Sequence, residues 1–168
     1  ESGGGERYFT ECFLNREKDS KIKFTVGYNH GYQHATVEKQ SELLRGVLKE
    51  EADIYSRLTT DYRHCLDLVR KWKGVTYEDL GERIGMDESA ARRIVNGQSQ
   101  GSINTLILIC LALGLPYKIS KHIIDHSPHS LIPRNESHDL YEFALTHLYP
   151  QPMNEILVFL NENGADPL

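Results

Sequence analysis

Apolar residues recur at helical intervals along most of the chain. From Thr36 to Gly74 they return at steps of three and four residues, which predicts two successive helices. We place the second of them from about Ile54 to Gly74, because a glycine that follows basic Lys71 and Lys73 is a typical helix end.

A series of shorter helices follows, and polar residues mark where they begin. Three helices are expected between residues 76 and 114, each preceded by a side chain that can cap the first turn and followed by a glycine. The capping residues are Thr76, Asp87 and Ser102, and the glycines are Gly85, Gly97 and Gly114. The third helix, residues 103–113, is apolar on every side, which is typical of the middle of a core. Pro116 allows one more helix, from about Tyr117 to His126.

The two ends of the chain show other patterns. Residues 21–27 alternate between apolar and polar side chains, which predicts a strand. Near the other end, two prolines in residues 127–135 indicate a linker. Amphipathic patterns then predict helices at about residues 137–148 and 153–163.

These elements predict a mainly α protein in three parts. Residues 1–35 are an N-terminal arm with one or two strands, residues 36–127 a helical domain with its core at 52–127, and residues 128–168 a C-terminal helical pair. The glycine-rich start, "ESGGGERYF", is typical of an added sequence or a shortened linker, and it leaves open whether the chain is a fragment of a longer protein.

The composition is that of an ordinary water-soluble domain. Apolar residues make up 39% of the chain and charged residues 26%, and the formal net charge is −5. No apolar run approaches the roughly 20 residues that a membrane helix needs, so no membrane association is expected. Cys65 and Cys110 lie in apolar helical patterns, which indicates core thiols in a reducing cytoplasm.

The segment before the apolar helix has the organisation of a helix-turn-helix. Only Gly85, Met86 and Asp87 separate the helix that begins after Thr76 from the next one, residues 88–96. This next helix has small and apolar residues for docking on one side and polar residues on the other. Such an arrangement places a recognition helix in the major groove of DNA.

Residues 75–116, "VTYEDLGERIGMDESAARRIVNGQSQGSINTLILICLALGLP", resemble the phage-repressor (Xre-type) helix-turn-helix family. The similarity lies in the spacing of "DLGERIGMDES", in the "RIVNG" end of the second helix and in the apolar helix that follows. It implies a five-helix fold, sequence-specific DNA binding and a dimer. The chain departs from the family at three positions: Tyr77 replaces the usual Gln, Gly81 the usual Ala and Val95 the usual Glu.

The resemblance assigns a DNA-binding surface to these residues. The candidates for base contacts are Tyr77, Ser89, Arg92, Arg93 and Asn96, and those for phosphate contacts are Arg83, Gln98, Ser99 and Gln100. Glu88 has two readings, since it can accept a hydrogen bond from cytosine N4 or simply favour the start of its helix. Ten basic and ten acidic residues over 51–127 leave the segment neutral.

The leading hypothesis is therefore a transcriptional regulator that binds double-stranded DNA as a homodimer, joined through the C-terminal helices or the N-terminal strand. The alternatives are a protein-interaction module that has lost DNA binding, and an accessory domain of a larger protein. We expect no enzymatic activity and no cofactor, because no catalytic or phosphate-binding motif is present. The His30–His34 and His122–His126 pairs have a spacing that can bind a metal, but we interpret them as surface residues.

Overall fold

The computed structural model describes residues 37–168, which are helical and contain no strand. They fall into two units, and α3 (Val37–Ser56) belongs to the first, residues 1–56. The second unit, Arg57–Leu168, contains all the later helices. The mainly α class is confirmed, whereas the expected N-terminal β arm lies outside the described residues.

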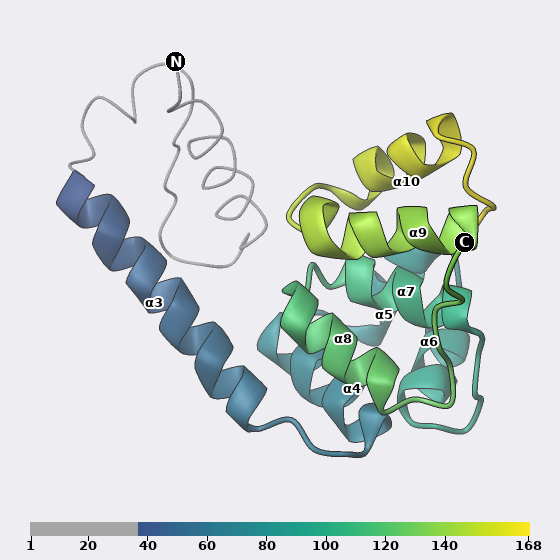
Figure 1. Ribbon diagram of the computed structural model, residues 1–168. Coiled ribbons are helices and arrows are strands. Elements are labelled where there is room, and N and C mark those ends of the chain that lie inside the picture. The colour runs from purple at the N-terminus through teal and green to yellow at the C-terminus, as the bar shows by residue number, and fades with distance from the viewer. Residues whose placement is uncertain (1–36) are drawn as a thin grey trace. The chain divides into compact units, whose positions relative to one another are not determined.

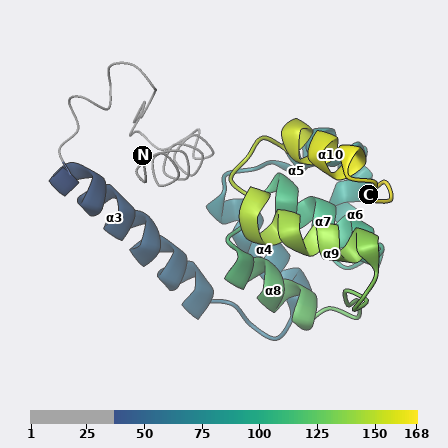
Figure 2. The same ribbon diagram turned by 45° about the horizontal axis from the view of Figure 1, so that its top comes forward.

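The second unit is built from short helices joined by tight turns (Figures 1 and 2). In chain order they are α4 (Tyr62–Trp72), α5 (Tyr77–Ile84), α6 (Glu88–Val95), α7 (Ile103–Ala112), α8 (Tyr117–Asp125), α9 (Glu136–Phe143), the π-helical turn η1 (Ala144–Leu148) and α10 (Met153–Glu162). None of the helices in residues 37–168 is long and apolar enough to cross a membrane.

One predicted helix boundary is wrong. The helix that we expected to begin near Ile54 is divided, because Ile54 ends up in α3 and the chain leaves the helix after Ser56. The helix resumes only after Asp61, whose side chain accepts a hydrogen bond from the backbone N–H of Arg63. The apolar periodicity runs through the break, so it does not reveal the cap.

The three predicted N-terminal caps are confirmed. Thr76 accepts from the Asp79 amide, and Asp79 accepts from that of Thr76 in return, which completes a capping box. Asp87 accepts from the Ala90 amide at 2.7 Å, and Ser102 starts α7 in the same way. The sequence thus sets the beginning of α5, α6 and α7 locally.

The core of the second unit is centred on α7. Every residue from Leu106 to Ala112 is buried, as the all-round apolar pattern predicts. The thiols of Cys65 and Cys110 are free and buried, which confirms them as core residues. Burial raises the pKa of Cys110 to about 12, so this thiol stays protonated and unreactive in the folded protein.

The C-terminal helices are packed onto this core. The turn η1 contacts α7 and α8. It continues directly from α9, and residues 149–152 connect it to α10 (Figure 1). Tyr141, Ile156 and Leu160 are buried in this layer. The final residues return along α9, where the Tyr141 hydroxyl donates to the carbonyl of Asp166 at 2.6 Å. Residues 128–168 therefore share the core of the preceding helices.

Gly81 is required by the turn that follows its helix. A Cβ atom on Gly81 would lie 2.5 Å from the carbonyl oxygen of Met86, which is backbone and cannot rotate away. The Met86 amide in turn donates to the Gly81 carbonyl at 2.9 Å, so the turn is folded tightly against α5. The departure from the family's alanine is thus explained by this close backbone approach.

We expect Gly81→Ala to lower the free energy of unfolding by about 1–3 kcal/mol, because the displaced turn outweighs the gain of about 1 kcal/mol in helix propensity. Urea denaturation followed by circular dichroism measures the change. Gly46→Ala is the control, because a Cβ atom there meets nothing within 4 Å. Equal or greater stability of Gly81→Ala would show that the turn adapts freely.

Candidate nucleic-acid interface

The α5–α6 pair presents a polar helix face to solvent. Gly85 ends α5 in the left-handed conformation, with φ of 70°, and Asp87 starts α6 two residues later. Ala91 and Val95 are buried and fix α6 to the domain. The outward side of α6 and its C-terminal cap carries the five exposed residues Glu88, Ser89, Arg92, Arg93 and Asn96.

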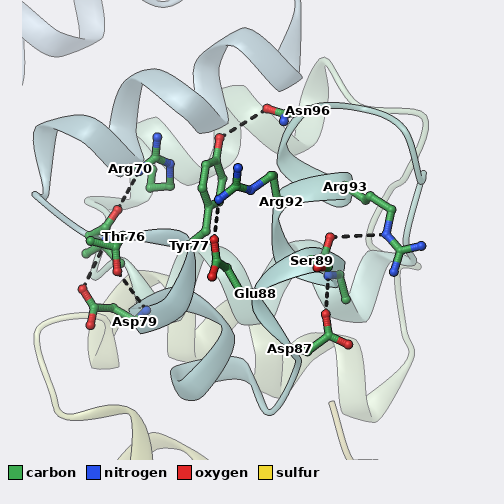
Figure 3. A network of polar contacts seen from close by, with 12 residues as sticks. Arg70, Thr76, Tyr77, Asp79, Asp87, Glu88, Ser89, Arg92, Arg93 and Asn96 are labelled. Atoms are coloured by element: carbon green, nitrogen blue, oxygen red, sulfur yellow. Dashed lines mark hydrogen bonds and ion pairs between the residues drawn. The ribbon is translucent and has the colours of Figure 1, made fainter.

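Tyr77, at the start of α5, lies at the centre of the polar contacts around this face (Figure 3). Its ring is 4.0 Å from the guanidinium carbon of Arg70 and 5.0 Å from that of Arg92. Figure 3 shows the ring between these two side chains. Stacking of guanidinium groups on an aromatic ring is attractive, so Tyr77 connects α4 to α6 through α5.

The hydroxyl group of Tyr77 fixes the orientation of the ring. It lies 3.2 Å from Asn96 Oδ1 and 3.3 Å from Asp67 Oδ1, as one donor shared by two acceptors. Tyr77 and Asn96, which the resemblance predicts as base contacts, are thus brought together and bonded to each other. While this bond persists, the Tyr77 hydroxyl cannot donate to a base, and Asn96 Oδ1 already accepts one hydrogen bond.

Asp67 on α4 stabilises the positions of Tyr77 and Arg70. It accepts from Arg70 Nη2 at 2.9 Å and pairs with Lys71 Nζ at 2.6 Å. Burial raises the pKa of Asp67, but the hydrogen bonds and positive charges of Lys71 and Arg70 outweigh it, so the pKa lies below its usual value. Arg70 also donates to the carbonyl of Val75 at 2.8 Å. Its guanidinium group is therefore held in place beneath Tyr77.

The two arginines of α6 have different surroundings. Arg92 forms an ion pair with Glu88, one turn earlier on the same helix, and both side chains are about half exposed. Arg93 instead donates from Nε to the backbone carbonyl of Ser89 at 3.3 Å. Among residues 37–168 we find no partner for the terminal nitrogens of Arg93. Arg93 is thus ready to donate to an external acceptor, whereas Arg92 is already neutralised.

The loop after α6 places three predicted residues beside the arginines. Gln98, Ser99 and Gln100 are exposed, and the backbone amides of the first two donate to the carbonyl of Arg93. The side chains of the loop, not these two amides, remain available for a ligand.

Arg63 is a cation at this loop that the sequence did not single out. A Cβ atom on Gly97 would lie 2.1 Å from Arg63 Cδ, so the arginine side chain lies across the glycine. Arg63 is about half exposed and lies near Asp61, with 3.6 Å between the charged groups. Arg63 lies in the first turn of α4, and α4 packs on α6. Its position in the sequence could therefore have indicated a cation near the α6 face.

Arg83 is not brought together with the other candidates. Its Nη1 donates to the carbonyl of Ala112 at 3.0 Å, at the C-terminal end of α7. This bond satisfies one of the carbonyls that a helix end leaves without an intrahelical partner. The structure thus gives Arg83 a bond within the domain, away from the α6 face.

Charge is unevenly distributed along the second unit. Residues 57–127 hold ten lysines and arginines and eight aspartates and glutamates. Residues 128–168 hold one arginine and six acidic residues. The helix-turn-helix part is thus slightly basic, while the C-terminal helices are strongly acidic and unsuited to a polyanion.

The described histidines do not gather into a metal site. The rings of His122 and His126 stack with centroids 4.1 Å apart, and His122 Nε2 lies 2.8 Å from the carbonyl of Thr59. No group of three or more potential metal ligands occurs within residues 37–168. His30 and His34 lie outside this range.

Comparison with known proteins identifies the segment that holds this face. Residues 66–119 match the family model described as helix-turn-helix, which confirms the resemblance predicted from the sequence. The match begins in α4 and ends in α8, so it includes all of α5, α6 and α7. No curated protein and no solved structure matches the chain.

Proposed function

We propose, on the premise that residues 66–119 are an Xre-type helix-turn-helix domain, that this protein is a transcriptional regulator that binds specific sequences in double-stranded DNA. The observation that carries the proposal is the outward polar face of α6, which follows a tight turn and exposes two arginines. A recognition helix of this kind enters the major groove with its outward side chains against base edges.

Roles follow from the surroundings of each side chain. Arg93 and Ser89 are the first candidates for base edges, and Arg92, Asn96 and Tyr77 join them when their internal contacts rearrange. Gln98, Ser99, Gln100 and Arg63 border the α6 face and suit phosphate contacts. Arg83 is left out, because its bond to Ala112 holds it at the end of α7.

Binding of random-sequence duplex DNA over a series of salt concentrations tests the proposal. Contacts to phosphates release counterions, so affinity should fall steeply as salt rises, with a slope of about −0.9 per phosphate contact on logarithmic axes. Selection from a random pool should then yield a preferred site. If no binding occurs at low salt, the helix-turn-helix acts instead as a protein-interaction module.

We further propose that the protein is a homodimer joined through the C-terminal helices. Phe143, Leu157 and Val158 are exposed there, and the ring of Phe143 stacks on that of Phe159 with centroids 5.6 Å apart. A dimer that binds two half-sites one helical turn apart on DNA needs its two copies of α6 about 34 Å from each other. The proposal matches the dimer that the family resemblance implies.

Sedimentation equilibrium tests the dimer. We expect association to strengthen with salt, because the acidic residues of two C-terminal pairs repel each other and salt screens them. Phe143→Ser/Val158→Ser should shift the protein to monomer, since it removes apolar area from the surface. A wild-type mass equal to one chain at every concentration, with and without DNA, would contradict the proposal.

A further inference from the structure

We propose that Glu88 determines the specificity of the α6 face. In the free protein Glu88 forms an ion pair with Arg92. On DNA the two side chains separate where Arg92 can bind guanine and Glu88 can bind cytosine. The inference rests on the proposed DNA binding and names the chemistry of the preferred site. It treats the acidic residue as part of the recognition surface.

Glu88 and Arg92 are placed to act as a unit. They lie one turn apart on the outward side of α6 and form an ion pair with each other. Asp87 already caps the helix through the Ala90 amide, so α6 does not need the Glu88 side chain as its cap. Figure 3 shows the Glu88 carboxylate directed toward Arg92 and not toward the backbone amides.

Tyr77 holds the guanidinium group of Arg92 from the other side. The ring lies 5.0 Å from it and is itself fixed by the bonds of its hydroxyl group to Asn96 and Asp67. Contacts with Glu88 and Tyr77 thus both favour the conformation in which Arg92 lies beside them. A confined side chain loses less conformational freedom when it binds, which favours a contact of one fixed geometry.

The acidic partner makes a phosphate a poor ligand for Arg92. A phosphate bound to Arg92 would lie close to the Glu88 carboxylate, which is a second negative charge, and this is unfavourable. A G·C base pair avoids this repulsion. Arginine donates to guanine O6 and N7, and a glutamate accepts from the amino group of cytosine N4. Discrimination thus arises from repulsion between Glu88 and an anionic ligand, which the cytosine amino group does not cause.

Within residues 37–168, Arg93 has no acidic partner of the kind that Arg92 has. Arg93 is the next residue in the chain, yet its internal bond goes to a neutral carbonyl and involves only Nε. It can approach phosphate or any acceptor without leaving an acid unpaired. The two neighbouring arginines therefore have different roles: Arg92, together with Glu88, selects a G·C pair, whereas Arg93 can bind either a base edge or a phosphate.

The variant Glu88→Gln tests this division, because it removes the charge and keeps the shape. Its affinity for random-sequence duplex at low salt should rise by about three- to tenfold, since one carboxylate no longer opposes the phosphates. Sites selected by the wild type should prefer guanine where Arg92 binds and cytosine where Glu88 binds. Sites selected by the variant should have a weaker preference for cytosine at that position.

Glu155→Gln on α10 is the matched control, because Glu155 is exposed and the same net charge is lost far along the chain from α6. Thermal unfolding tests whether both variants are folded. If Glu88→Gln behaves like Glu155→Gln in affinity and in site selection, the inference is overturned while DNA binding stands. If wild type and variant both fail to bind, both proposals fall. Binding by the variant alone would show that Glu88 blocks the face.

Discussion

Replacing Arg92 and Arg93 together by alanine should lower the affinity for duplex DNA by about a hundredfold at low salt. The reason is that the two side chains are the cations on the exposed face of α6, and each can donate to bases or phosphates. The salt dependence should change as well. Because we expect Arg93 to be able to contact phosphate and Arg92 to contact a base, the slope on logarithmic axes should become shallower by about 1. Fluorescence anisotropy with a labelled duplex measures both quantities.

A control with the same change in charge separates this site from general attraction. Lys118→Ala/Lys121→Ala removes two cations from α8, which packs on α4 and on η1. Its affinity should fall by much less than that of the α6 variant. Equal losses in the two double variants would mean that net charge governs binding, and that the α6 face has no special role.

Replacing Ile156 by alanine should lower the free energy of unfolding by about 2–5 kcal/mol. Ile156 lies on α10 with no exposed surface, in the layer that the C-terminal helices form over the core. The truncation leaves a cavity in that layer, and because the layer packs through η1 on α7 and α8, we expect the whole second unit to unfold earlier. Urea denaturation followed by circular dichroism measures the change.

Asn161 provides the comparison on the same helix, outside the proposed dimer surface. Its side chain is exposed, so Asn161→Ala should change stability by no more than about 0.5 kcal/mol. A small effect of Ile156→Ala, or a separate early transition confined to the C-terminal helices, would mean that these helices are an independent appendage. A single shifted transition would mean that α6 depends on them for its stability.

Local sequence signals were sufficient for much of the fold. The caps at Thr76, Asp87 and Ser102 follow from one side chain and one amide a few residues apart, so the sequence contains the whole interaction. The burial of α7 follows from its lack of any polar face. The exposed side of α6 could also be predicted locally, because polar residues lie on one side of this helix and small or apolar residues on the other.

Contacts between distant residues could not be predicted. The bond from Arg83 to Ala112 joins residues 29 apart, and nothing in the local pattern distinguishes it from a free surface arginine. The position of Tyr77 between Arg70 and Arg92 likewise needs three helices at fixed angles. Helix propensity disfavours Gly81, and the close approach of the Met86 carbonyl, which explains this glycine, depends on the folded turn.

The central claim is that the outward face of α6 is the surface that meets DNA, and chemical-shift mapping tests it most directly. The isotope-labelled protein is titrated with a short duplex while the backbone amides and arginine Nε groups are followed. We predict that the largest shifts occur at residues 88–100, with the Arg93 Nε signal among them. Shifts confined to residues 128–168, or none at low salt, would contradict the claim.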